Sequence, residues 1–101
     1  MVSEYSTLLN LNTIVAFDTD GTLITYDDKP RYDIINLYHM FEKLGCTMVI
    51  MSGGGEDYAR TWAEKLGLEA DKICCKFDLD FKPDIMFDDE SVEIGKINIR
   101  V

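Results

Sequence analysis

The sequence has few of the residues from which disulfide frameworks and zinc sites are built. It contains one histidine, His39, and three cysteines, Cys46, Cys74 and Cys75. The odd cysteine count has no framework spacing, and adjacent cysteines do not readily pair with each other. A single histidine excludes the two-histidine motif of zinc proteases. We therefore expect reduced thiols and a cytoplasmic protein.

Long apolar runs and basic residues are also scarce. Runs such as 14–17 and 48–51 fall far short of the ~20 residues that span a bilayer. Residues 1–5 lack the basic start and apolar centre of a secretory leader, so none is expected. Ten Lys and Arg against 19 Asp and Glu give a formal charge of −9. This balance disfavours sequence-independent nucleic-acid binding and docking on membranes, and we expect neither.

The pattern of apolar residues predicts one α/β domain over the whole chain, 1–101. The sequence is 47% hydrophobic and 29% charged, which is enough for one modest core. Strands alternate with helices, which is typical of a small, mainly parallel sheet in a Rossmann-like three-layer sandwich. The expected strands cover 13–17, 47–51, 73–75, 84–87 and 96–101, and the expected helices run from Pro30 to Leu44 and through 59–66, before Gly45 and Gly67.

Polar residues follow three of the predicted strands at the point where each strand ends. The first strand leads into Asp18-Thr19-Asp20-Gly21, the second into Ser52-Gly53-Gly54-Gly55, and the fourth into Asp88-Asp89. Each string alone is also typical of an ordinary turn. Because parallel strands end at one edge of a sheet, we expect these carboxylates and backbone N–H groups to share one crevice. Clustered carboxylates with anion donors beside them suit a Mg²⁺–phosphate site.

The order of these strings resembles the four motifs of the haloacid dehalogenase (HAD) superfamily. The matching parts are Phe17 to Leu23, Ser52-Gly53-Gly54, a later lysine and the Asp88-Asp89 pair. Most members are Mg²⁺-dependent phosphohydrolases on a Rossmann-like sheet. The resemblance therefore implies a hydrolase, specifically a phosphatase that acts on phosphate monoesters with Mg²⁺ as cofactor.

The resemblance also implies roles for individual residues. Asp18 would attack phosphorus to form an aspartyl-phosphate, and Asp20 would protonate the leaving oxygen and later activate water. The Asp18 carboxylate and the Asp20 backbone carbonyl would ligate the metal. Ser52 and Gly53 would bind the substrate phosphate together with the motif lysine, which would also serve catalysis.

Two assignments depend on strand geometry. The motif lysine is Lys76 or Lys82, and an extended stretch from Lys82 to Asp88 would place Lys82 at the wrong end of the sheet. Lys76 directly follows the third strand, so we favour it. Strand alternation points Asp88 and Asp89 to different sides. The resemblance to family members without a cap domain, in which the second residue of such a pair often ligates, favours Asp89 as the metal ligand, and we keep Asp88 in the site.

The spacing of the motifs leaves no room for a cap domain, so the chain resembles the capless members. An open site suits a phosphorylated substrate that is bulky, such as a protein or an oligonucleotide end. A small metabolite is the alternative if oligomerisation closes the site. Two other functions stay open: a non-catalytic HAD-like binding protein and, less favoured, a receiver-like phospho-acceptor domain. A receiver carries its acceptor aspartate after the third strand, where this sequence has Lys76.

Overall fold

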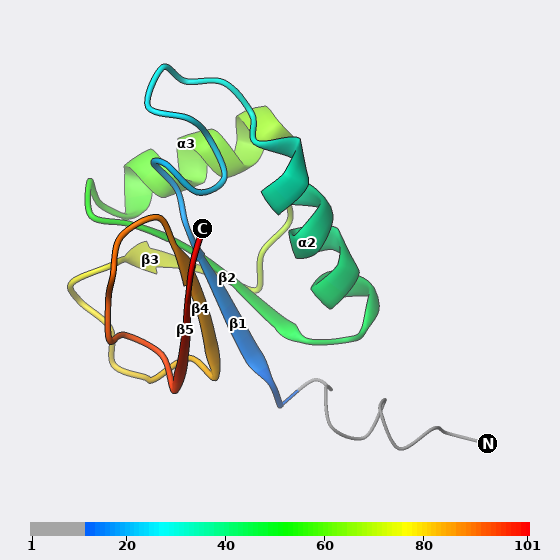
Figure 1. The fold of residues 1–101 in the computed structure, drawn as a ribbon, viewed down its shortest axis with the longest axis vertical. Helices are drawn as coiled ribbons and strands as arrows, with labels where there is room; N and C mark the ends of the chain where they lie inside the picture. The colour runs from blue at the N-terminus through cyan, green and yellow to red at the C-terminus, as the bar shows by residue number, and fades with distance from the viewer. Residues whose placement is uncertain (1–11) are drawn as a thin grey trace.

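The computed structural model describes residues 12–101 and contains a five-stranded, all-parallel sheet (Figure 1). Two helices connect the first three strands, and the strand order is β3-β2-β1-β4-β5. The predicted α/β fold class is confirmed, without an inserted cap domain in the described residues. Residues 1–11 lie outside that range. They belong to the predicted domain and include residues 1–5, for which the sequence predicted no secretory leader. The elements are β1 (Ile14–Asp18), α2 (Tyr32–Lys43), β2 (Thr47–Ser52), α3 (Glu56–Leu66), β3 (Lys72–Cys75), β4 (Ile85–Asp88) and β5 (Ile97–Arg100).

The limits of the helices follow from the residues at their ends. Helix α2 begins at Tyr32, so the prediction that Pro30 lies in its first turn was wrong. Pro30 instead forms an isolated antiparallel bridge with Ile24, outside the helix. Gly45 follows the helix with a φ of 87°, and Gly67 ends α3 with a φ of 68°. Both are left-handed conformations that favour glycine, as their predicted positions after the helices require.

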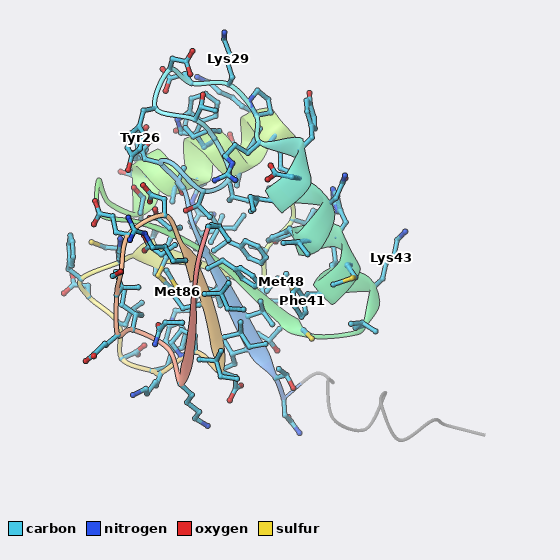
Figure 2. The ribbon with its side chains drawn as sticks, in the orientation of Figure 1. Tyr26, Lys29, Phe41, Lys43, Met48 and Met86 are labelled. Atoms are coloured by element: carbon cyan, nitrogen blue, oxygen red, sulfur yellow. The ribbon has the colours of Figure 1, made fainter. Side chains whose placement is uncertain are left out.

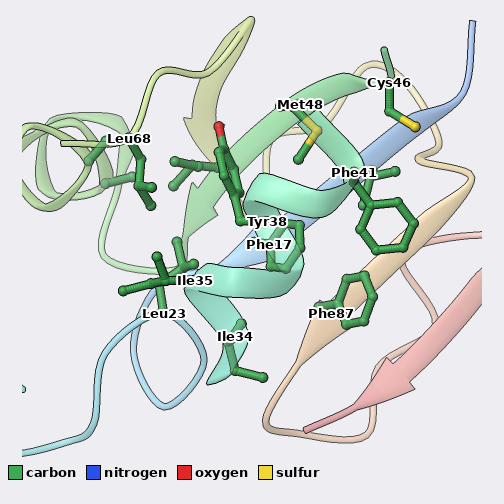
Figure 3. Close-up of a cluster of buried hydrophobic side chains, with 14 residues drawn as sticks. Phe17, Leu23, Ile34, Ile35, Tyr38, Phe41, Cys46, Met48, Leu68 and Phe87 are labelled. Atoms are coloured by element: carbon green, nitrogen blue, oxygen red, sulfur yellow. The ribbon is translucent and has the colours of Figure 1, made fainter. Parts of the chain in front are cut away.

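Both helices pack on the same face of the sheet (Figures 1 and 3). The rings of Phe17 and Phe87 stack with their centroids 4.7 Å apart. The ring centroid of Tyr38, from α2, lies 5.2 Å from that of Phe17. Ala59 and Ala63 bring α3 into the same cluster. In the described residues neither helix is long and apolar enough to cross a membrane.

The opposite face of the sheet is covered by loops. Its smaller core contains Ala16, Val49 and Met86, against which the connections 76–84 and 89–96 place apolar side chains. These connections are too short for crossover helices that would span the sheet. The third layer of the sandwich therefore consists of loops in this part of the chain, which run from the carboxyl end of one strand to the amino end of the next.

The side chain of Asp84, just before β4, forms a hydrogen bond with the first residue of β1. Its carboxylate accepts a 2.7 Å hydrogen bond from the Ile14 backbone N–H, and it lies 3.1 Å from Lys96 Nζ. The backbone bond above all, and then Lys96, hold the pKa of Asp84 below its ordinary value. A carboxylate with a depressed native pKa stabilises the fold above its unfolded pKa, and this contribution disappears as the pH falls through the native value.

We expect Asp84→Asn to lower the free energy of unfolding at pH 7 by about 1 kcal/mol, because a neutral acceptor makes a weaker bond than a carboxylate. Below about pH 3.9, the ordinary aspartate pKa, the difference should shrink as the native protein also loses the charge. Urea denaturation between pH 7 and pH 3 measures both effects. Asp78→Asn, at an exposed loop position, serves as the control. A loss that does not change with pH would contradict the electrostatic explanation.

Candidate functional site

A pocket of about 290 Å³ lies at the carboxyl ends of the strands. Residues from the ends of β1, β2, β3 and β4 line it, although they are far apart in the sequence. Seven residues were predicted to form the site, and Asp88 is the one that does not line the open pocket. The other six do: Asp18, Asp20, Ser52, Gly53, Lys76 and Asp89.

Lys76 joins the buried carboxylates of the site. Its Nζ lies 2.7 Å from Asp88 Oδ2 and 3.8 Å from Asp18 Oδ1, and its side chain is 9% exposed. The backbone N–H of Lys76 donates to the Ser52 carbonyl, which fixes the chain where β3 ends. Lys82 is exposed and lies just before β4, at the opposite edge of the sheet. Of the two candidate lysines, the structure therefore places only Lys76 in the pocket.

The carboxyl group of Asp18 lies in a poorly solvated place. Its side chain is 7% exposed, at the end of the fully buried part of β1. Burial and the neighbouring Asp88 raise the pKa of Asp18 to about 7, although Lys76 and the Thr19 backbone act in the opposite direction. One ammonium group is thus too little positive charge for the carboxylates around it.

Three carboxylates form a cluster whose chemistry fits a hard divalent cation. One oxygen each from Asp18, Asp88 and Asp89 lies within 4.8 Å of the other two. With Lys76 paired to Asp88, three negative charges against one positive charge leave a formal charge of −2. Carboxylate oxygens are the ligands that Mg²⁺ prefers. Both Asp88 and Asp89 contribute to the cluster despite the alternation of side chains along a strand.

The carboxylate of Asp20 lies apart from this cluster. Its Oδ1 accepts a 2.7 Å hydrogen bond from the hydroxyl of Tyr58, which projects from the first turns of α3. This bond to Asp20 is the main reason that the pKa of Tyr58 is raised. Sequence reasoning missed Tyr58, because only the docking of α3 on the sheet brings it to Asp20. The sequence gives one indication of this role: Tyr58 lies two residues after the start of a helix that follows a strand end.

Tyr26 approaches the cluster from the flap, residues 24–29 (Figure 2). Its hydroxyl donates to Asp89 Oδ2, and this bond raises the pKa of Tyr26 to about 12. Gly21 makes the approach possible, because a Cβ there would lie 2.3 Å from Asp89 Oδ2 and 2.9 Å from the Tyr26 ring. The φ of Gly21 is 79°, so both its backbone and its missing side chain suit this position.

The glycine loop after β2 forms another wall of the pocket. Ser52 is 1% exposed, and its Oγ accepts a 2.9 Å hydrogen bond from the Gly54 N–H. The hydroxyl hydrogen of Ser52 remains available to donate to an anion. The exposed Gly53 lies beneath the ring of Phe77, whose Cε2 would be 3.0 Å from a Cβ at Gly53. Phe77 is a second pocket residue that sequence reasoning missed, although it directly follows Lys76.

Comparisons of this chain with protein-family models, with curated proteins and with solved structures found no match.

We expect Lys76→Met to lower the free energy of unfolding at pH 7 by about 3 kcal/mol, because it leaves Asp18 and Asp88 buried without their cation. Lys82→Met removes a lysine of the same length at an exposed position and should change stability by less than about 0.5 kcal/mol. Chemical denaturation of both variants measures the difference. Equal stabilities would show that the Lys76 ion pairs do not support the fold.

We expect Gly21→Ala to weaken divalent-cation binding at least about tenfold, because the new methyl group displaces Asp89 and Tyr26 from the cluster. Gly45→Ala is the matched control: Gly45 has a similar φ of 87°, but a Cβ there meets nothing within 4 Å. Both variants should lose about 1 kcal/mol of stability from the positive φ alone. Calorimetric titration with Mg²⁺ separates them, and equal affinities in the two variants would contradict the proposed ligand set.

Proposed function

We propose that this protein is a Mg²⁺-dependent phosphomonoesterase of the HAD type that acts through an aspartyl-phosphate on Asp18. The observation that carries the proposal is the convergence of Lys76 with the carboxylates of Asp18, Asp88 and Asp89 at one pocket. These groups come from three different strand ends. If each of these sequence motifs only formed a turn, their side chains would not need to meet at one pocket.

In the first half of the reaction, an Asp18 carboxylate oxygen attacks phosphorus while the bond from phosphorus to the ester oxygen breaks. Asp20 gives its proton to that oxygen, and the alcohol leaves. In the second half, Asp20 takes a proton from water as the water oxygen attacks phosphorus. The bond between phosphorus and Asp18 breaks, which releases inorganic phosphate and restores both carboxyl groups.

The hydrogen bond from Tyr58 gives Asp20 a fixed direction for this exchange of protons. The bond occupies Oδ1 of Asp20 and leaves Oδ2 for the ester oxygen or for water. The Asp20 carboxylate lines the pocket but lies outside the carboxylate cluster, which leaves this side chain for proton transfer, while the Asp20 backbone carbonyl would ligate the metal. Tyr58 is a positioning residue in this scheme.

The transferring phosphoryl group would be held by Lys76, by the Ser52 hydroxyl and by the backbone at Gly53. Lys76 contributes a positive charge that is already oriented by Asp88, so little reorganisation is needed as charge develops. The carboxylates of Asp18, Asp88 and Asp89 and the backbone carbonyl of Asp20 would hold Mg²⁺. When bound, the ion supplies charge neutralisation for the carboxylates and for the phosphoryl oxygens.

The pocket opens to solvent without a cap domain in the described residues. This arrangement admits a phosphate on a bulky substrate such as a protein or an oligonucleotide end, and also a small ester if a second subunit closes the site. The reduced state expected of the three cysteines agrees with function in the cytoplasm.

We expect Asp18→Asn to lower kcat for p-nitrophenyl phosphate by at least about a thousandfold with Mg²⁺ present, because the amide is not a nucleophile. Asp57→Asn, on the exposed first turn of α3, is the control and should keep full activity. A panel of phosphate esters assayed with and without Mg²⁺ tests the reaction class. Activity of Asp18→Asn near that of the unsubstituted protein would refute the mechanism, and no turnover of any ester would refute the proposed function.

A further inference from the structure

The mouth of the pocket carries two aromatic side chains that the proposed reaction does not use. Among the described residues, Phe77 and Tyr26 are the most exposed of the large hydrophobic side chains, at 78% and 72%. Both line the same pocket. Single exposed aromatic residues are common on protein surfaces. Two that share the mouth of a polar pocket indicate contact with a ligand.

Each ring lies against a glycine of the site. Tyr26 is fastened through its hydroxyl to Asp89, and its ring lies close to Gly21. Phe77 lies over Gly53, and the turn that closes from the Asp78 N–H to the Cys75 carbonyl fixes its backbone. Figure 2 shows Lys29 pointing outward at the top of the flap, and Tyr26 lower on the same loop. Both rings thus lie beside residues of the proposed phosphate and metal sites, Phe77 at Gly53 and Tyr26 at Asp89.

The charge around the rings is negative. Among the described residues that line the pocket, Lys76 is the one cation, and Asp18, Asp20, Asp89 and Glu90 are carboxylates. A divalent ion would offset the charge of Asp18 and Asp89, and Asp20 holds a proton when it acts as the general acid. Glu90 then remains as a negative charge in the pocket lining. The charge of Glu90 acts on both Tyr26 and Lys76, so Glu90 lies close to the mouth as well. A second negative charge on the substrate would be repelled here.

We propose that the pocket selects phosphate monoesters whose leaving group carries a cationic ammonium or guanidinium group close to the phosphate. This proposal rests on the proposed phosphatase function and names its substrate class. Aromatic faces attract cations, and the Glu90 carboxylate adds charge complementarity. The phosphate would meet Lys76 and the Ser52 loop while the cation lies at the rings and Glu90.

The test uses two esters of nearly the same shape, phosphocholine and 3,3-dimethylbutyl phosphate, in which carbon replaces the charged nitrogen. We expect kcat/KM with Mg²⁺ to favour phosphocholine by about tenfold, the upper range of cation–π attraction at a partly solvated site. Phe77→Leu and Glu90→Gln should each reduce this ratio about threefold or more. Tyr32→Leu, an exposed aromatic residue of α2 outside the pocket, should leave it unchanged. Because each variant is compared through a ratio, the intrinsic reactivity of the two esters cancels.

Binding separates a failure of this proposal from a failure of the phosphatase function. Calorimetry with the Asp18→Asn variant gives the dissociation constants of both esters without turnover. A preference for phosphocholine that Phe77→Leu reduces supports the cation site even if no ester is hydrolysed. Equal affinities and equal kcat/KM values for the two esters would overturn it. Unchanged melting temperatures would show that the variants fold.

A third pair of substrates identifies the source of the cation. Phosphoserine peptides that carry either lysine or norleucine next to the phosphoserine are compared with phosphocholine. Faster turnover of the lysine peptide than of phosphocholine supports a peptide-borne cation, and the reverse order supports a small alkylammonium ester. Turnover of the norleucine peptide at the rate of the lysine peptide, together with equal rates for phosphocholine and its isostere, would overturn the proposal.

Discussion

The ion pair between Lys76 and Asp88 is the interaction on which the arrangement of the site depends. Both side chains are nearly removed from water, and a buried charge is tolerated only when it is paired. The pair joins the end of β3 to the end of β4, two strands that are separated by β2 and β1 in the sheet. Asp18 lies at the end of β1, between β3 and β4 in the strand order. Its Oδ1 is 3.8 Å from Lys76 Nζ, so the same ammonium group also attracts this carboxylate. One lysine thereby contacts carboxylates from two other strand ends, which the pairing of the parallel strands brings together.

Most of the framework around this pair could be predicted from the sequence. Continuous apolar runs such as Ile14–Phe17 are typical of strands covered on both faces, and glycines such as Gly45 and Gly67 mark helix ends. The placement of Lys76 followed from the length of an extended strand, since Lys82 could not reach the carboxyl edge. The start of α2 could not be predicted, because Pro30 fits either a first helical turn or an extended bridge, and only its pairing with Ile24 decides between them.

The residues that sequence reasoning missed lie where one element meets another. Tyr58 reaches Asp20 only because α3 docks on the face of the sheet at a particular rotation. The fit of Asp89 and Tyr26 beside Gly21 depends in the same way on where the flap returns to the strand ends. Periodicity indicates which side of a helix is buried, but it does not determine which polar group at the rim meets which partner. Such contacts follow from tertiary structure alone.

The absence of helices on one face of the described sheet also has a consequence for the site. A crossover helix between β3 and β4 would carry the chain away from the strand ends, whereas the connection 76–84 turns at once after Lys76. This turn directs Lys76 toward the buried carboxylates and places Phe77 over Gly53. Adjacent residues thus contribute the buried cation and the exposed ring of one pocket. A substitution that alters the turn will therefore move both the Lys76 ammonium group and the Phe77 ring at the mouth of the pocket. Phe77→Leu, by contrast, changes the side chain at the mouth and keeps the turn.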